Sequence, residues 1–170
     1  MTNHQSPRRR LGPVLLLVLG ALLVLGGTGW LTLAGDEIRA PASLAGWPLS
    51  EQVTGPEAQR QIEQLHSKGF PLTGGVVARY GGGMATVWIS STWLPVMAAR
   101  QVEAMTDRIA EGRSPFAPTG QEVIGGKTVY VLRGMGQTHY YFQHGRLVVW
   151  LAASPQIARQ SLTELIQALP

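Results

Sequence analysis

Residues 122–152 read EVIGGKTVYVLRGMGQTHYYFQHGRLVVWLA, and this stretch decides the fold class. The two-residue links Gly125-Gly126 and His144-Gly145 suit tight hairpins, because glycine permits the positive φ angles that such turns require. Between these links, runs rich in β-branched and aromatic residues predict four strands, at Glu122–Ile124, Lys127–Leu132, Thr138–Gln143 and Arg146–Ala152. The stretch therefore predicts a four-stranded antiparallel meander.

The last of these runs is apolar on both faces. Side chains alternate along a strand, so Leu147, Val149 and Leu151 point to one side and Val148 and Trp150 to the other. A strand that is apolar on both sides is typical of the middle of a covered sheet. We therefore expect this strand at the centre, with both of its faces buried.

The sequence around the meander predicts a second hairpin and three amphipathic helices. Gly75–Tyr80 and Met84–Ser91 are strand-like runs joined by three glycines. Helical periodicity predicts helices at 55–68, at 92–112 and after Ser154-Pro155. The predicted apolar stripes are Ala58, Ile62 and Leu65; Leu94, Ala98, Val102, Met105 and Ile109; and Ala158, Leu162, Leu165 and Leu169.

These elements predict an α+β domain at residues 55–170. Neighbouring strands are joined by so few residues that their pairings must be antiparallel. The amphipathic helices need a sheet face to cover. We therefore expect a two-layer domain in which an antiparallel sheet, made of the hairpin and the four-stranded meander, is covered by about three helices, after an N-terminal transmembrane helix.

The predicted transmembrane helix is an apolar segment without charged residues, from Leu11 to Gly35. As a helix it would measure about 37 Å, enough to cross a hydrocarbon core of about 30 Å. Asp36 and Glu37 follow it, and residues 36–54 contain prolines and glycines without a sustained period, which is typical of a tether. The bilayer is thus one predicted partner, contacted by residues 11–35.

The charges beside this segment predict its orientation. Arg8, Arg9 and Arg10 precede it, so the basic tail of residues 1–10 should be cytoplasmic and the domain extracytoplasmic, periplasmic or extracellular. Trp30 fits the outer membrane interface. A cleaved secretory signal is the alternative, since Ala40-Pro41-Ala42 has the small-residue form of a cleavage site, although the apolar run is longer than a signal core.

The composition excludes several classes of function. The chain has 14 basic and 10 acidic residues, and three of the basic ones are the N-terminal arginines, so the domain is nearly neutral and nucleic acid is not a predicted partner. It has no cysteine, which excludes disulfides, thiolate metal sites and a catalytic thiol. No cofactor is predicted, because Gly125-Gly126-Lys127-Thr128 lacks the spacing and the following helix of a phosphate-binding loop.

The strongest local candidate for a site is the segment from Met135 to His144. His139, Tyr141 and Gln143 alternate onto one face of the predicted strand, and Tyr140 and Phe142 onto the other. Met135, His139 and His144 are residue types that bind copper without cysteine, although they are predicted near both ends of a strand. Tyr141, Trp93 and His139 form a predicted interaction surface, because Tyr and Trp dominate binding hot spots.

Three hypotheses of function remain open at this point. The first is a membrane-anchored extracytoplasmic binding or accessory protein, a small subunit or assembly factor of a membrane complex with a protein partner. It rests on the anchor and on the lack of a common hydrolase motif. The second is a carrier of a small ligand or copper that uses the face of His139 and Tyr141. The third is an enzyme with a dispersed acid and base pair.

Overall fold

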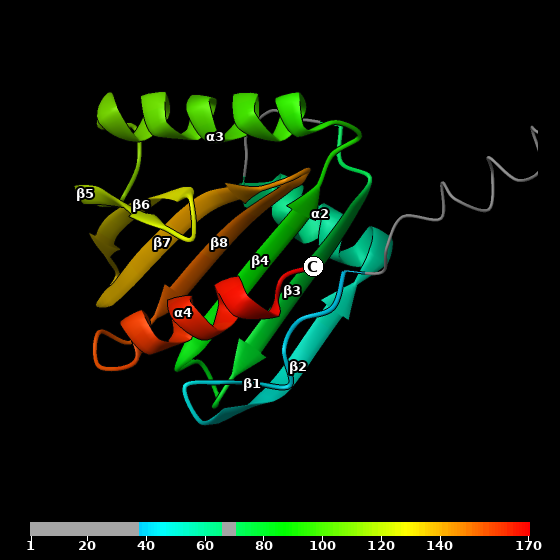
Figure 1. The fold of residues 1–170 in the computed structure, drawn as a ribbon, viewed down its shortest axis with the longest axis vertical. Helices are drawn as coiled ribbons and strands as arrows, with labels where there is room; N and C mark the ends of the chain where they lie inside the picture. Colours follow the sequence, from blue (N-terminus) through cyan, green and yellow to red (C-terminus); the bar gives the residue numbers. More distant parts are fainter. Residues whose placement is uncertain (1–37, 66–70) are drawn as a thin grey trace, which may run out of the picture. The chain divides into compact units, whose positions relative to one another are not determined.

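Eight strands form one sheet in the computed structural model, which describes residues 38–65 and 71–170 (Figure 1). In chain order they are β1 (Ser43–Leu44), β2 (Trp47–Thr54), β3 (Gly74–Tyr80), β4 (Ala85–Ser91), β5 (Ala117–Ile124), β6 (Lys127–Gly134), β7 (Gln137–His144) and β8 (Leu147–Ala153). Their order across the sheet is β1-β2-β3-β4-β8-β7-β6-β5, and every pairing is antiparallel. The predicted α+β class, hairpin and meander are confirmed. The last strand, β8, lies inside the sheet as expected, between β4 and β7.

Three helices accompany the sheet in the described part of the chain. They are α2 (Gly55–Leu65), α3 (Pro95–Ala110) and α4 (Ala158–Ala168). Within residues 38–65 and 71–170, none of the helices has the length and hydropathy to cross a bilayer. The predicted membrane segment from Leu11 to Gly35, with Arg8, Arg9, Arg10 and Trp30, lies outside the described residues.

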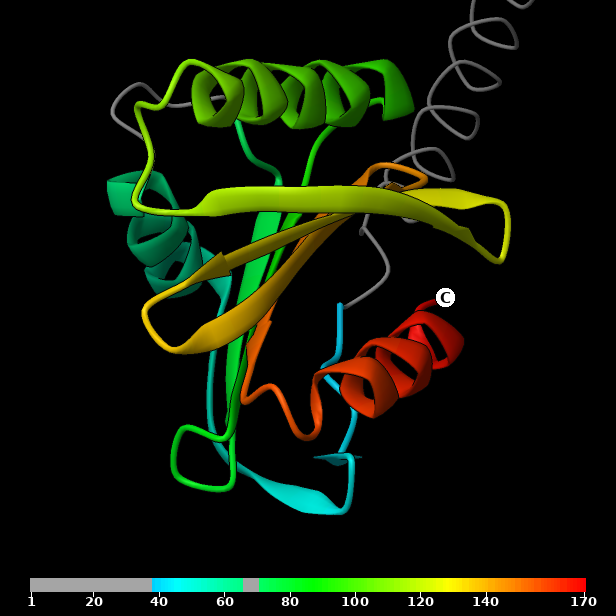
Figure 2. The ribbon, with the colours of Figure 1, turned by 90° about the vertical axis from the view of Figure 1, so that its left-hand side faces the viewer.

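The helices lie on both faces of the sheet, so the predicted two-layer arrangement is wrong (Figure 2). On one face α4 packs against aliphatic side chains of β4 and β8, among them Val87, Val149 and Leu151. On the other face α2 packs against Val77 of β3, and α3 packs against side chains of β6, β7 and β8. The physical reason is that β4, β7 and β8 carry buried side chains on both sides, so each side needs a cover.

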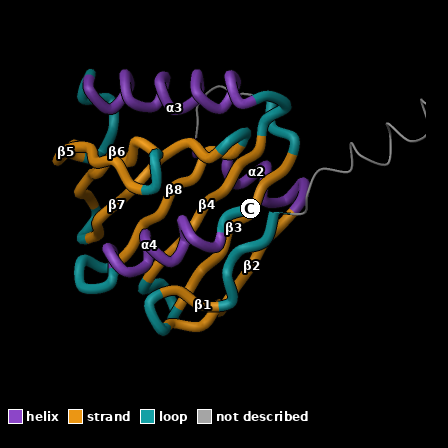
Figure 3. The backbone as a smooth tube through the Cα atoms, in the orientation of Figure 1, coloured by secondary structure: helices purple, strands orange, loops and turns teal. Residues whose placement is uncertain are grey.

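The segment predicted as a tether forms part of this sheet instead. Residues 43–54 contribute β1 and β2, which extend the sheet beyond β3 (Figure 3). Leu44 is fully buried in the core, and Ala45 and Gly46 make the turn between the strands with positive φ angles of 49° and 80°. The sequence obscured this hairpin because β2 is mostly exposed and shows no apolar alternation. The compact unit therefore begins at Ile38 rather than at residue 55.

Two smaller corrections affect the region around the site. The turn between β7 and β8 consists of Gly145 and Arg146, because His144 pairs with Leu147 at the strand ends. Leu94, predicted in the buried stripe of α3, is exposed, because it is the residue that caps the start of the helix. A polar residue, Gln101, takes a buried position on the same helix.

Candidate functional site

A row of aromatic side chains crosses the centre of the sheet on the face covered by α2 and α3. Tyr130 on β6 lies opposite Tyr141 on β7, which lies opposite Trp150 on β8, which lies opposite Trp88 on β4. The Tyr130 and Tyr141 rings stack with centroids 4.7 Å apart, and the Tyr141 and Trp150 rings stack at 5.4 Å. Because such pairs add to the stability of neighbouring strands, the row gives this face a rigid aromatic floor.

His139 lies beside the row and has both ring nitrogens engaged. Its Nε2 atom is 3.0 Å from the carbonyl oxygen of Gly134, and its Nδ1 atom is 3.2 Å from the indole Nε1 of Trp150. An indole N–H can only donate and a carbonyl can only accept, so Nε2 carries the proton and Nδ1 accepts. The ring is therefore a neutral imidazole with a fixed tautomer.

The surroundings of His139 hold it in that neutral state. Burial lowers its pKa from the ordinary value of 6.5, and the Gly134 carbonyl opposes this effect only in part. The ring of Phe116 covers it at a centroid distance of 4.5 Å. Phe116 comes this close because Gly134 has no side chain: a Cβ atom placed there would lie 2.6 Å from the Phe116 Cδ1 atom. The imidazole is thus a polar group of the site with a fixed orientation.

A cavity of about 530 Å³ opens above this floor, between α2 and α3. Trp88, Trp150 and His139 belong to its floor, while Ile62 of α2 and Met105 of α3 line its sides. The remaining lining residues are Ser90, Gln101, Pro115, Phe116, Met135, Gln137, Val148 and Ala152. Its size and its mainly apolar lining with a few polar groups are typical of small-molecule sites.

Gln101 is the unusual polar residue of this cavity. Its side chain is 2% exposed, and its Oε1 atom has no hydrogen-bond partner. A buried acceptor without a donor costs about 1–3 kcal/mol, so such groups are rare in folded proteins. A bound molecule with an N–H or O–H group would supply the missing donor.

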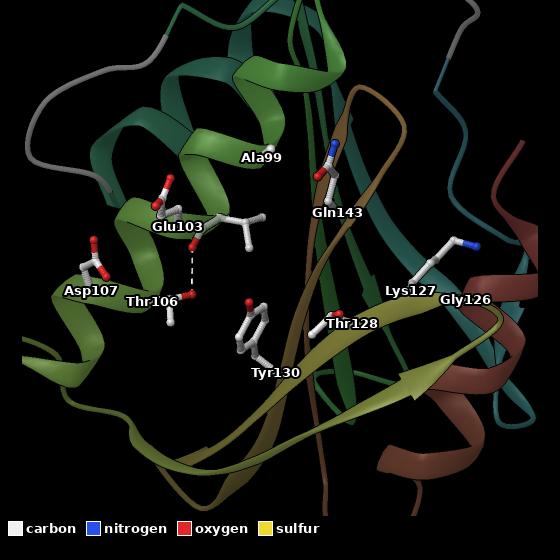
Figure 4. Close-up of a pocket in the computed structure, with 10 residues that line it drawn as sticks. Ala99, Glu103, Thr106, Asp107, Gly126, Lys127, Thr128, Tyr130 and Gln143 are labelled. Atoms are coloured by element: carbon white, nitrogen blue, oxygen red, sulfur yellow. Dashed lines mark hydrogen bonds between the residues drawn. The ribbon is translucent and has the colours of Figure 1, made fainter.

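A second hollow, also of about 530 Å³, lies between α3 and β6 and has a different character (Figure 4). Glu103 and Asp107 stand on α3, and Lys127 and Tyr130 come from β6. Thr106 donates to the carbonyl of Val102 at 2.9 Å and lies 3.0 Å from the hydroxyl of Tyr141. No group of three or more His, Cys, Asp or Glu side chains in the part of the chain that the structure describes is arranged to hold a metal ion.

The three residues predicted as copper ligands are not all brought together. Met135 and His139 line the same cavity, but His144 lies at the other end of β7. From the first to the last of the eight residues of that strand the chain rises by about 23 Å, at about 3.3 Å for each step between neighbours. The ring of His144 has its own partner, because its Nε2 atom lies 2.6 Å from the carbonyl oxygen of Pro170. Copper binding stays a prediction without a gathered set of three ligands.

The predicted interaction surface is also divided. Tyr141 and His139 are buried, so they do not belong to an outer surface. His139 lines the cavity, whereas Tyr141 lies in the apolar core beneath α3. Both lie on the face that the strand alternation predicts, opposite to Tyr140 and Phe142. Trp93 is 63% exposed and lies at the start of α3.

Gln101 and Phe116 are among the cavity residues that sequence reasoning missed. Gln101 is three residues after Ala98 and four before Met105, so helical spacing already indicated that it faces the sheet; only its polarity hid it. Phe116 lies next to the start of β5, in a region without a periodic pattern, and no sequence signal could have placed it against His139.

Comparisons with known proteins add no relative to this picture. No protein family, no curated protein and no solved structure matches the chain.

Proposed function

We propose that this domain binds a small, mainly apolar molecule with an N–H or O–H donor in the cavity between α2 and α3. The observation that carries the proposal is the cavity of about 530 Å³ that Trp88 and Trp150 line, together with Gln101 in its lining, whose buried Oε1 atom has no partner. The indole rings supply broad apolar contact, and the amide supplies orientation. A ligand that fills the space would bury its apolar surface and pair the buried acceptor in one step.

The proposal favours binding over catalysis. Both nitrogens of His139 are engaged, so the imidazole cannot take a proton without losing the bond from Trp150. Its lowered pKa, which results from burial, also favours the neutral ring. His139 would then shape the cavity and hold Trp150 in position.

We further propose that the domain works at the extracytoplasmic side of a membrane, where the segment from Leu11 to Gly35 anchors it. The support is the unbroken apolar segment and the three arginines before it. A small subunit or assembly factor with a protein partner stays a prediction beside this one. The same anchor would serve both functions.

The test uses 4-bromobenzamide as the probe, because it has a flat apolar ring and an amide N–H group. Bromine quenches indole fluorescence on contact, and Trp88 and Trp150 line the cavity. The full chain in lipid nanodiscs is titrated, and the saturable part of the quenching is separated from the linear part that comes from the lipid. The proposal expects saturable quenching.

Two matched variants make the test specific to the cavity. Ser90→Leu enlarges a buried side chain on its floor, whereas Thr128→Leu makes a similar change in the polar hollow. Ser90→Leu should weaken the saturable quenching about tenfold or more, equal to about 1.4 kcal/mol, and Thr128→Leu should leave it unchanged. Equal binding by both variants, or no saturable quenching in the unchanged protein, would overturn the proposal. If circular dichroism shows that Ser90→Leu is unfolded, Ala152→Leu replaces it.

A further inference from the structure

Three large exposed apolar side chains lie within four positions of the chain, where β4 leads into α3 (Figure 1). Trp93 is 63% exposed, Leu94 is 56% exposed and Val96 is 53% exposed. We call these three residues the α3 N-terminal patch. Single exposed apolar residues need no explanation, but a contiguous group that includes a tryptophan indicates a binding surface.

Hydrogen bonds hold the backbone around this patch in place. The Thr92 hydroxyl lies 2.9 Å from the carbonyl of Leu94 and 3.1 Å from that of Arg146, and the Thr92 N–H donates to Arg146 at 3.0 Å. On the other side, Gln143 donates from Nε2 to the carbonyl of Pro95 at 2.9 Å. The patch is therefore fixed to the turn between β7 and β8. Its side chains are presented to solvent by a rigid support.

The described chain begins at the same end of the sheet. A Cβ atom placed on Gly74 would lie 3.8 Å from Ile38 Cδ1 and 2.9 Å from Ser91 Oγ. Ser91 is the last residue of β4, two positions before Trp93. Ile38, the first residue of the compact unit, is thus close to the strand end from which the patch extends.

The sequence limits how far this end can lie from the predicted membrane segment. Only Asp36 and Glu37 separate Gly35 from Ile38. Three extended steps of the chain reach at most about 11 Å. If the segment from Leu11 to Gly35 crosses a bilayer, the end of the sheet that carries the patch lies beside the lipid headgroups.

We propose that the α3 N-terminal patch inserts into the interfacial region of that lipid bilayer. Tryptophan prefers this region, because its ring is buried there while its N–H stays hydrated. Arginine side chains adjoin the patch: Arg100 follows Val96 by one helical turn and is exposed, and Arg146 neighbours Thr92. The domain would then lie on the membrane in one orientation.

The test uses the absence of cysteine in the chain, since one introduced cysteine gives a single nitroxide label. Val96→Cys places the label in the patch. Gln156→Cys is the matched control: this exposed residue follows β8, at the opposite end of the sheet. The full chain is reconstituted in vesicles of phosphatidylcholine and phosphatidylglycerol. Spin-label collision rates with oxygen, which concentrates in lipid, and with a neutral nickel chelate, which stays in water, then report depth.

The proposal expects the label at position 96 to favour oxygen and the label at position 156 to favour the nickel chelate. Replacing Trp93 and Leu94 by serine in the Val96→Cys chain should raise collisions with the chelate about severalfold, because the label then rises toward water. These side chains are exposed, so the change should leave the circular dichroism spectrum unaltered.

Three results would overturn the proposal. Equal access of the chelate to both labels would show that the patch faces water. Protection of position 96 from both oxygen and chelate would show that protein covers the patch, either a second copy or a partner. A chain that does not float with the vesicles would remove the membrane anchor itself, while the cavity proposal would stand unaffected.

Discussion

The two faces of the sheet are both covered by helices, but in different ways. The sheet curls around α4, which contacts β7 and β8 as well as β1 near the opposite edge, where Glu164 accepts from the Ala45 N–H at 2.6 Å. On the outer side of this curve, α2 and α3 pack on different strands and leave the Trp88 and Trp150 floor between them. One helix packs on a continuous apolar core on the concave face, whereas the two helices on the convex face flank a cavity.

The largest expected effect is a loss of stability that differs between matched variants on the two faces of the sheet. Leu162 of α4 is fully buried in the closed core, so Leu162→Ala should lower the free energy of unfolding by about 2–5 kcal/mol. Met105 of α3 borders the cavity and already lacks neighbours on one side. Met105→Ala should therefore lower it by less, about 1–2 kcal/mol. Denaturation of both variants in detergent, followed by circular dichroism, gives the two values.

A comparison of these variants can also contradict the account. If Met105→Ala is as costly as Leu162→Ala, the space between α2 and α3 is packed as tightly as the core around α4. The cavity would then be no more than a surface depression, and the contrast between the two faces would disappear.

The sequence predicted the strands of the meander better than it predicted which side chains lie opposite each other on neighbouring strands. Gly125-Gly126 was placed correctly as a turn, but the turn between β7 and β8 was placed at His144-Gly145 instead of Gly145 and Arg146. A shift of one position at a turn keeps each side chain on its face but moves its partner by two residues. Tyr141 would then lie opposite Val148, so the aromatic row through Trp150 could not be derived.

The layer arrangement and the cavity could not be predicted from any single stretch of the sequence. Alternation showed that β8 has two buried faces, but it could not show on which face each helix lies, because that depends on the path of the chain between elements. The cavity depends on the gap between α2 and α3. That gap depends on which strands α2 and α3 pack against, and no local sequence pattern indicates those strands.

The second prediction concerns how stability depends on pH through His139, on the face of the sheet that α2 and α3 cover. Burial lowers the pKa of His139 in the folded chain below its ordinary value of 6.5. At pH values between the folded-state pKa and 6.5, the unfolded chain therefore binds more protons than the folded chain. The free energy of unfolding should therefore fall as the pH drops below about 6.5, with a slope of at most about 1.4 kcal/mol per pH unit from this one group. His139→Gln should remove this part of the slope. Denaturation at pH values from about 7.5 to about 5 measures it.

The control for this prediction is the histidine at the other end of the same strand. His144→Gln removes a histidine without touching the network of His139, Trp150 and Gly134, so the slope should remain. An unchanged slope in His139→Gln would mean that the fixed neutral imidazole does not contribute to the pH dependence of stability.

The smallest expected effect is a gain, not a loss, in the free energy of unfolding. It also distinguishes an effect on stability from an effect on ligand binding. Gln101→Met keeps the volume of the side chain but removes the unpaired Oε1, so it should raise the free energy of unfolding by about 1 kcal/mol. Ser161→Ala is a matched control on α4, where a buried hydroxyl also has no partner but does not line the cavity between α2 and α3. Both variants should be more stable, but only Gln101→Met should weaken the saturable quenching by 4-bromobenzamide. If Gln101→Met gains stability and binds the probe as before, the amide does not serve the ligand. The same measurement would then leave an apolar cavity that selects its ligand by shape alone.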